Sequence, residues 1–457
     1  MSVESPSGRP TAAAWGRIRG HAADPLFRSA YSLMVNAGVT AVLGIAFWVV
    51  AARLYEADEV GRDAALIAAM VELSTMCQLN LTNVLTRFLP SLERGTARAL
   101  AAAYAASGGA ALLIGSAFVV VAPLVSEDLD FLRNDPRTAV LYVVAQVTWG
   151  WFVLQDAALT ALRRAPWIPV ENGVFGALKL AALPLAIAFG GSHGVFLSWV
   201  LPAVVLLLPV NLFLFRAAIP AHVSRYRPKG SSLQRLGRRR LVRFMGQDWA
   251  ATVLAQASTT ALPLLVVAML GAAANAYFYI PFTIIVTFNM LFHAASNSLV
   301  VEGAMAEDRI RVLATRLVRH LVLVLVAGTA VIVAAAPLIM LPFGEDYVRE
   351  STSVLRILAC ACVFRAASVL YIALARLDGR GLRILAVEAV QMSLLLAGAI
   401  TLAHPLGLDG VALAWLCSAA VVALALLPSL VRLLRSPPLK AAPPEGARTS
   451  SEEILMP

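Results

Sequence analysis

The sequence predicts an all-α integral membrane protein of about twelve transmembrane helices, arranged as two parallel six-helix repeats around a central cavity. Three observations support this fold class: the apolar composition, the long charge-free runs, and the distribution of Lys and Arg between the loops. Of the 457 residues, 60% are hydrophobic and 14% are charged, whereas soluble proteins carry about 25% charged residues. This composition excludes a soluble enzyme and a disordered protein, and it argues against a nucleic-acid partner despite the net charge of +10.

The charge-free runs give the number of spans. Leu180–Phe215 and Trp249–Val301 contain no Asp, Glu, Lys or Arg, and each is too long for one spanning helix of about 20 residues. Each run therefore forms two spans, with turns at residues 190–194 and 271–275. The predicted spans are residues 29–52, 63–86, 99–123, 138–161, 168–189, 195–215, 244–270, 275–300, 320–341, 351–375, 383–403 and 410–431.

The basic residues give the orientation. With the N-terminus in the cytoplasm, 29 of the 37 Lys and Arg residues fall in inner segments and six in outer segments, as the positive-inside rule requires. A wrong helix count would destroy this asymmetry, so we expect both termini in the cytoplasm. Arginine outnumbers lysine 34 to 3 and alanine is abundant, which is typical of a GC-rich bacterial genome. We therefore expect a multi-pass protein of the bacterial cytoplasmic (inner) membrane.

An internal repeat relates the two halves. Residues 194–199 (GVFLSW) recur as residues 410–415 (GVALAW), and Glu171 recurs as Glu388, at nearly constant offsets. Because each half holds an even number of spans, the repeats are parallel, and such transporter plans place the substrate site between the halves. The expected segments are a cytoplasmic N-terminus (1–28), a first bundle (29–215), a basic linker (216–243), a second bundle (244–434) and a disordered tail (435–457).

Several ordered motifs resemble a known superfamily. They are Ala51–Tyr55, Leu85–Pro90, Pro342–Tyr347, Leu355–Ala359 and Pro405–Ala414. In this order and within a twelve-span frame, they resemble the multidrug/oligosaccharidyl-lipid/polysaccharide exporter superfamily, in its polysaccharide-biosynthesis (O-antigen flippase-like) branch. Each motif is a loose pattern, and the combination covers nearly the whole chain.

The resemblance implies a V-shaped pair of bundles that moves a polyprenyl-diphosphate-linked oligosaccharide between membrane leaflets by alternating access. The expected partners are this lipid-linked oligosaccharide, membrane lipids, and glycosyltransferases or a polymerase of the same pathway. The alternative is a multidrug or small-solute exporter of the same superfamily. Multidrug relatives often carry an acidic residue in the first span, where this chain has Asn36. A scaffold without transport activity is a further alternative. We do not expect an enzyme such as a polyprenyl-dependent glycosyltransferase or ligase. The outer loops are too short to form the extracytoplasmic platform that would hold its acceptor substrate.

Two cations within the spans are candidates for the substrate path. Arg365 lies near the middle of the tenth span and Lys179 near the middle of the fifth. A diphosphate head group in a low-dielectric site would need such a cation. Alternatively, each cation pairs with a buried carboxylate, or Lys179 extends its ammonium toward the interface.

A polar stripe on the eighth span is a third candidate. Asn289, His293 and Asn297 are spaced four residues apart and share one helix face. They could contact sugar hydroxyls in a cavity. The alternative is hydrogen bonding between helices, which contributes about 0.6 kcal/mol per contact in membranes.

Four acidic residues are candidates for coupling or gating. Glu72, at mid-depth in the second span, could carry a coupling proton or belong to a structural ion pair. Asp156, Asp248 and Glu388 lie nearer the inner face. These three could close an inner gate with Arg163, Arg243 or Arg376, or could be solvated interfacial charges.

The cysteines indicate no covalent or metal framework. Cys77, Cys360, Cys362 and Cys417 all fall within predicted helices, and residues two apart on a helix point to different faces. No phosphate-binding glycine loop or zinc spacing is present in the sequence. We therefore expect no cofactor and no metal.

Overall fold

The computed structural model describes residues 25–92, 95–188, 193–225, 253–254, 256–257, 260–305, 310–377 and 381–435. Every regular element in this part of the chain is a helix. Seven helical stretches within it are long and apolar enough to span a membrane, and two shorter apolar helices, Gly38–Leu54 and Thr260–Leu270, accompany them. The protein is therefore a multi-pass membrane protein, as the composition predicts.

The first half (the N half) follows the predicted spans closely. Its helices are α2 (Pro25–Leu54), α3 (Ala57–Cys77), α4 (Leu81–Phe88), α5 (Thr96–Val125), α6 (Phe131–Asn134), α7 (Pro136–Ala161), α8 (Ile168–Ala188), α9 (Gly194–Phe213) and α10 (Ile219–Arg225). The residues at the start of α7 fix where this helix begins. Asp135 caps α7, because its carboxylate accepts the Arg137 backbone N–H, and Pro136 occupies the first helical position.

The second predicted span is not one continuous helix. We expect a single helix over 63–86, but α3 ends at Cys77 and α4 begins at Leu81. Leu79 and Asn80 adopt positive φ angles of 50° and 61°, a left-handed conformation that ends a right-handed helix. This break explains why the predicted span contains several polar residues among its apolar ones.

The boundary of the predicted basic linker is also different. Residues 214–218 continue α9 as a π-helical turn, and α10 extends the helical chain to Arg225. Leu214, Ala218 and Ile219 are buried against α4, α5 and α7. Apolar packing therefore keeps the first ten residues of the expected linker in the first bundle.

The second half (the C half) contains the remaining six spans. Its helices are Thr260–Leu270, α12 (Ala272–Met305), α13 (Ile310–Met340), α14 (Glu345–Leu377) and α15 (Gly381–Arg435). Gly271, at φ 92°, separates the first two helices at the expected turn. The 55-residue α15 contains two predicted spans, and Gly407 interrupts its helical geometry with φ 58° and ψ −137°. Described helices coincide with eleven of the twelve predicted spans, and the seventh, 244–270, is described as a helix over residues 260–270.

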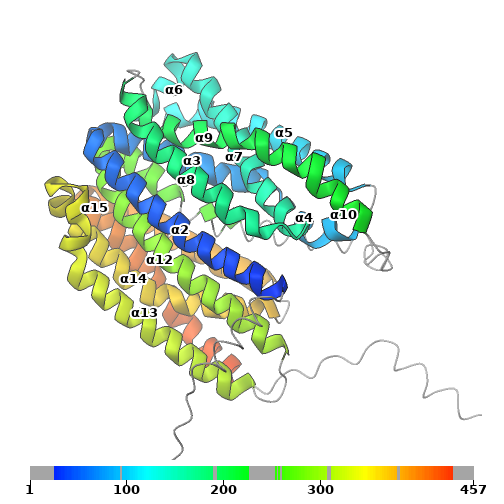
Figure 1. The fold of residues 1–457 in the computed structure, drawn as a ribbon. Helices are drawn as coiled ribbons and strands as arrows, with labels where there is room; N and C mark the ends of the chain where they lie inside the picture. Colours follow the sequence, from blue (N-terminus) through cyan, green and yellow to red (C-terminus); the bar gives the residue numbers. More distant parts are fainter. Residues whose placement is uncertain are drawn as a thin grey trace, which may run out of the picture.

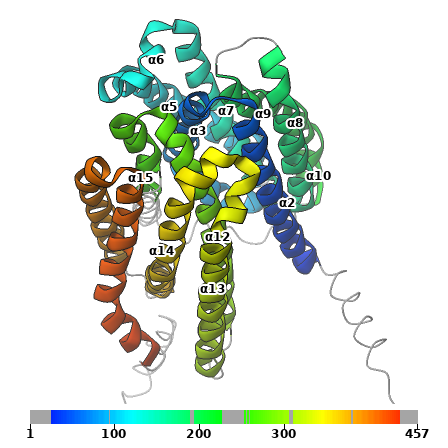
Figure 2. The same cartoon turned by 90° about the vertical axis from the view of Figure 1, so that its left-hand side faces the viewer.

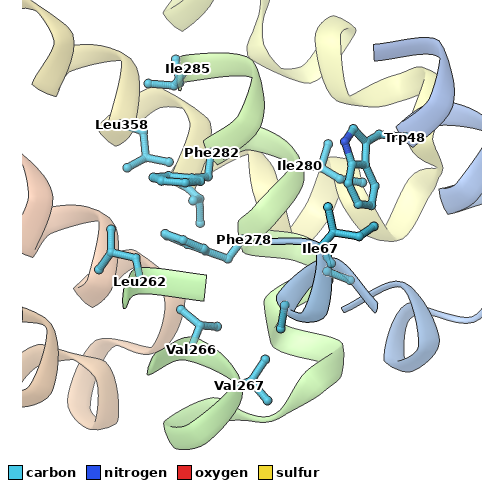
Figure 3. Close-up of a cluster of buried hydrophobic side chains, with 14 of the residues drawn as sticks. Trp48, Ile67, Leu262, Val266, Val267, Phe278, Ile280, Phe282, Ile285 and Leu358 are labelled. Atoms are coloured by element: carbon cyan, nitrogen blue, oxygen red, sulfur yellow. The ribbon is translucent and has the colours of Figure 1, made fainter. Parts of the chain in front are cut away.

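One hydrophobic core joins the two halves. It includes Phe47, Trp48 and Ile67 of the N half together with Leu262, Val266 and Phe278 of the C half. Figure 3 shows Trp48 of α2, Ile67 of α3, Leu262 and Val266 of the helix Thr260–Leu270, and Phe278 of α12 around this core. Figure 1 shows α2 and α12 running side by side along this contact, which we call the seam.

The halves are joined at one end of the seam. This end carries Arg53 and Leu341, and we call it the outer end after its predicted orientation. The Arg53 guanidinium donates to the carbonyl oxygens of Pro342 and Leu341, at 2.7 and 3.0 Å. Asn275 Nδ2 donates to the Gly61 carbonyl at 2.8 Å, and the Ala272 N–H donates to Asp128 Oδ2 at 2.9 Å. We call these contacts the outer latch.

A glycine permits the closest approach within the outer latch. A Cβ atom on Gly61 would lie 1.7 Å from the Ala272 carbonyl oxygen and 2.9 Å from the Ala276 nitrogen. Only a residue without a side chain allows α3 and α12 to pack this closely. Figure 2 shows the helices spreading apart toward the opposite end, where α2 begins and α15 ends. The conformation is thus closed at the outer end.

A second contact fixes the outer end of α9 on α3. Asp63, which is buried, accepts the Phe196 backbone N–H at 3.0 Å and contacts His193 Nδ1 at 2.8 Å. Phe131 packs its ring on the His193 ring, with 4.4 Å between the centroids. Asp63 lies two residues after Gly61, so the turn of α3 that forms the latch is also held by α9.

Candidate functional site

Lys179 lies inside a cage of aromatic rings. Its ammonium nitrogen is 3.8 Å from the centroid of the Trp199 ring, 4.8 Å from that of Phe47 and 5.4 Å from that of Phe175. The side chain is 4% exposed. Cations at this distance from desolvated aromatic faces are stabilised by about 2 kcal/mol. The cage therefore partly replaces the hydration that Lys179 loses.

Helix geometry places the cage residues together. Phe175 and Lys179 are four residues apart on α8 and share one face. Phe47 comes from α2 and Trp199 from α9, and both helices pack on α8. Gly176 allows the close approach of α2, because a Cβ atom there would lie 2.5 Å from Leu43 Cδ1. The local sequence of α8 thus builds the site that Lys179 occupies.

The cage contains no acidic partner for Lys179. Among the described residues, no carboxylate forms an ion pair with its ammonium. Of the two alternatives predicted for Lys179 besides substrate contact, the carboxylate pair is not formed in this conformation. A buried ammonium without a counter-ion could accept an anionic group of a ligand.

A network of polar side chains lies in the same half. Asp156 and Glu171 are its acidic members, on α7 and α8. Asn172 Nδ2 donates to Asp156 Oδ2 at 3.3 Å and to Asn36 Oδ1 at 3.2 Å, and Gln155 donates to Glu171 Oε1. One oxygen of each carboxyl group is buried without a hydrogen-bond partner. The network could therefore hold a proton or a cationic group of a ligand.

This network extends across the bundle to α5. Asn211 of α9 donates to Gln155 Oε1 at 3.0 Å and accepts from the Tyr104 hydroxyl at 2.8 Å. Tyr104 in turn accepts the Trp151 indole N–H at its backbone carbonyl. We did not predict Glu171, Gln155 or Tyr104 as site residues. The sequence pattern that could have identified this network is the two adjacent polar pairs Gln155–Asp156 and Glu171–Asn172, which flank the turn between two spans.

The C half contains a single buried ion pair among its described side chains. Arg365 Nη2 lies 3.8 Å from Glu388 Oε2, and the two side chains are 13% and 6% exposed. Arg365 therefore pairs with a buried carboxylate, which is the alternative to substrate contact that the sequence allows. The side chain of Arg376, one of the arginines predicted to close the gate, lies outside the description, so the gate contact of Glu388 stays a prediction.

The polar stripe on α12 is only partly described. Asn289 Nδ2 contacts Cys362 Sγ at 3.3 Å, which is an interhelical contact between α12 and α14. The side chains of His293 and Asn297 lie outside the described residues, and so does Asp248. The predictions for these three residues therefore stay predictions. Arg163, the expected gate partner of Asp156, is exposed and forms no described contact with it.

Glu72 lies at the seam, at mid-depth. Its Oε2 atom accepts a hydrogen bond from the Thr260 hydroxyl at 2.7 Å, which joins α3 of the N half to the first helix of the C half. Its Oε1 atom is buried and has no hydrogen-bond partner among the described residues. The structural ion pair considered for Glu72 is not formed among the described residues.

The repeat relates two of these groups. Glu171 and Glu388 occupy equivalent positions near the start of the second helix of a hairpin, and both are buried. Glu171 lies in an acidic and amide network, whereas Glu388 pairs with a guanidinium. Within the described residues, no group of three or more His, Cys, Asp and Glu side chains could hold a metal ion.

Solved structures with the same fold are transporters. An outward-facing multidrug resistance MATE family transporter of the MOP superfamily is 16% identical, with 90% of this chain and 96% of that chain covered, at a TM-score of 0.57. A MOP superfamily transporter from Pyrococcus furiosus Vc1 is 16% identical, with 90% and 97% covered, at a TM-score of 0.59. Its structure is described as having a binding pocket of reverse polarity that suggests a different function.

A third similar structure is a MATE protein in a bent conformation, 15% identical over 90% of this chain, at a TM-score of 0.57. The scan against protein-family models finds no match. The search of curated proteins finds none either. The chain therefore has the fold of MOP superfamily transporters, as the sequence resemblance implies, and the choice of the flippase branch rests on the sequence motifs alone.

Proposed function

We propose that this protein is an alternating-access exporter that moves a polyprenyl-diphosphate-linked oligosaccharide across the bacterial cytoplasmic membrane, for cell-surface polysaccharide biosynthesis. The fold supports the exporter class, because transporters of the MOP superfamily share it over about nine-tenths of the chain. The closed outer latch supports alternating access, because it joins the halves at one end of the seam.

Lys179 carries the substrate assignment. It is a buried ammonium with no ion-pair partner in the described part of the chain, at membrane depth and beside aromatic rings. An anionic diphosphate would supply the missing counter-charge. The aromatic faces of Trp199 and Phe47 would suit the apolar surface of a sugar or an isoprenoid chain. A cationic drug would instead be repelled by Lys179.

A multidrug exporter is the second candidate function. The Asp156–Glu171 network favours it, because paired carboxyl groups could bind a cationic solute. Two of the similar structures belong to MATE transporters. Asn36 also lies in this network. Because its side chain is uncharged, it favours neither candidate function.

Ligand-induced stabilisation separates the two candidates. A ligand that binds only the folded state raises the unfolding temperature in proportion to its occupancy. We expect a short-chain polyprenyl-diphosphate disaccharide to raise the unfolding temperature of the wild-type protein in detergent. Lys179→Met should remove this shift, and the matched variant Lys179→Arg should retain it, because it keeps the charge.

The opposite result would favour the second function. Stabilisation by a cationic dye, without stabilisation by the diphosphate lipid, would overturn the flippase proposal. In that case, Asp156→Asn should remove the effect of the dye.

We also infer from the Lys and Arg distribution that both termini lie in the cytoplasm. From the proposed substrate we infer glycosyltransferases or a polymerase of the same pathway as partners.

A further inference from the structure

Glu72 is a buried carboxyl group between the two halves of the molecule. It is 4% exposed, and its single described hydrogen bond comes from Thr260 across the seam. It lies eleven residues beyond Gly61 on α3, which places it about 16 Å deeper than the outer latch at 1.5 Å per residue. The hydrogen bond between Thr260 and Glu72 is therefore the deepest polar contact described across the seam.

Among the described residues, no element around Glu72 offers it a counter-ion. The helices packed on α3 carry few ionisable groups that charge near neutral pH: Arg28 and Arg53 on α2, Arg98 on α5, Arg137 and Asp156 on α7, and His293 and Glu302 on α12. The tyrosines of these helices are Tyr31, Tyr104, Tyr142, Tyr277 and Tyr279, and α3 itself adds Asp58, Glu59, Arg62, Asp63 and Cys77. The side chains of Arg28 and Tyr31 lie outside the description. No described contact links any of these side chains to Glu72. The side chains of His293 and Glu302 lie outside the description.

The contact geometry suits a protonated carboxyl group. An ionised carboxylate would bring a full charge into an apolar seam with one hydroxyl donor, which is costly at membrane depth. A neutral carboxyl group can still accept the Thr260 hydrogen bond at Oε2. The unpartnered Oε1 atom can carry the proton without placing a charge in the core of Figure 3.

We propose that Glu72 is a proton-binding site that controls closure of the seam. Protonated Glu72 is compatible with the closed seam and its Thr260 contact. Loss of the proton leaves a charged group that is stable only when the halves separate and water reaches it. Proton uptake from the outer side would thus promote closure of the outer end. This inference rests on the proposed exporter function only for its link to transport.

The test measures the conformation of the full-length protein without any substrate. Spin labels at Glu127 and Glu350, which are exposed at the outer ends of the two halves, report the separation of the outer end in lipid nanodiscs. The four native cysteines are first replaced by serine or alanine. We expect the population with a long label distance to increase as the pH rises from about 5 to about 9.

Two variants decide whether Glu72 is the responsible group. Glu72→Gln, which imitates the protonated side chain, should give the short distance at every pH. Glu59→Gln, which changes an exposed carboxyl group on the same helix α3, should respond to pH as the wild type does. A Glu72→Gln protein with the wild-type pH response would overturn the inference, and so would a wild-type protein without any response.

A third variant tests the contact itself. Thr260→Val removes the hydroxyl donor and should shift the wild-type pH response toward lower pH, because the closed seam then loses its hydrogen bond to Glu72. An unchanged response would overturn the role of the Thr260 contact. Failure to transport any lipid-linked oligosaccharide would reject the proposed function and would leave these distance measurements interpretable.

Discussion

At the scale of single residues, three buried polar groups of this protein have partners other than an opposite charge. Lys179 faces aromatic rings, Glu72 accepts a hydroxyl, and Asp156 contacts an amide. Arg365 and Glu388 form an ion pair at 3.8 Å. Partial satisfaction of this kind leaves lone pairs and charges available to ligands or protons, which is the property that a transport site needs.

The cap of α7 gives a pH-dependent prediction at this scale. The Thr138 hydroxyl and then the Arg137 backbone N–H lower the pKa of Asp135, which lies outside the spans. A lowered pKa contributes stability above the ordinary value of about 4. That contribution is lost as the pH falls through the lowered pKa of the folded protein.

We therefore expect Asp135→Ala to lower the unfolding temperature at pH 7 and to reduce its decrease below pH 4. Asp135→Asn is the matched control, since asparagine also caps helices but does not titrate. Thermal unfolding in detergent between pH 3 and pH 7 measures both effects. Equal unfolding temperatures for wild type and Asp135→Ala at pH 7 would contradict the capping role.

Sequence reasoning predicts part of the candidate site. Lys179, Arg365 and Glu72 are recognisable because charges within long apolar runs are costly and therefore conspicuous. The rings around Lys179 could not be predicted, because Phe47 and Trp199 come from spans whose packing the sequence does not specify. Glu171 was missed as a site residue because it lies near a helix end, where acidic residues are common.

At the scale of elements, the break between α3 and α4 gives a second prediction. Leu79 adopts φ 50° and is 41% exposed. A left-handed conformation costs a residue with a side chain roughly 1–2 kcal/mol. Leu79→Gly should therefore raise the free energy of unfolding by up to about 1 kcal/mol, since little buried surface is lost.

The control is a leucine in regular helix. Leu113 on α5 is 76% exposed, and Leu113→Gly should lower the free energy of unfolding by about 1 kcal/mol. Denaturant unfolding of the purified protein gives the sign of both changes. A loss of stability in Leu79→Gly similar to that in Leu113→Gly would show that the positive φ angle stores no strain.

Elements were predicted well where apolar runs are long. The expected spans that the structure describes fall on helices, because the bilayer requires each crossing segment to satisfy its own backbone hydrogen bonds. The break at residues 78–80 and the extension of α9 through α10 were not predicted. Both depend on burial of specific apolar side chains, such as Leu85 and Leu214, which periodicity alone does not reveal.

At the scale of the whole molecule, closure of the outer end depends on the close contact of α3 with α12. Gly61→Ala would place a Cβ atom 1.7 Å from the Ala272 carbonyl oxygen, and both obstacles nearest to it belong to the backbone. We expect this variant to fold and to favour the long distance between labels at Glu127 and Glu350. Gly44→Ala is the control, since nothing lies within 4 Å of its Cβ position.

The distance distribution of Gly61→Ala also tests the description of the latch. If the variant keeps the short distance of the wild type, then α3 and α12 do not control closure. The duplicated sequence predicts two halves with a site between them; the fold matches that of MOP superfamily transporters, and the site between the halves stays a prediction. The residues of the latch were not predictable, because Gly61 and Asn275 are ordinary residues until the two halves are brought together.

The central claim is that this protein carries a lipid-linked oligosaccharide across the membrane and that Lys179 contacts its anionic head. The most direct measurement uses proteoliposomes with a fluorescent polyprenyl-diphosphate oligosaccharide and scores the accessibility of the probe from outside. We expect translocation by the wild type and by Lys179→Arg, with at least a tenfold loss in Lys179→Met, which corresponds to about 1.4 kcal/mol. Folded wild-type protein that leaves the probe in its original leaflet would contradict the claim.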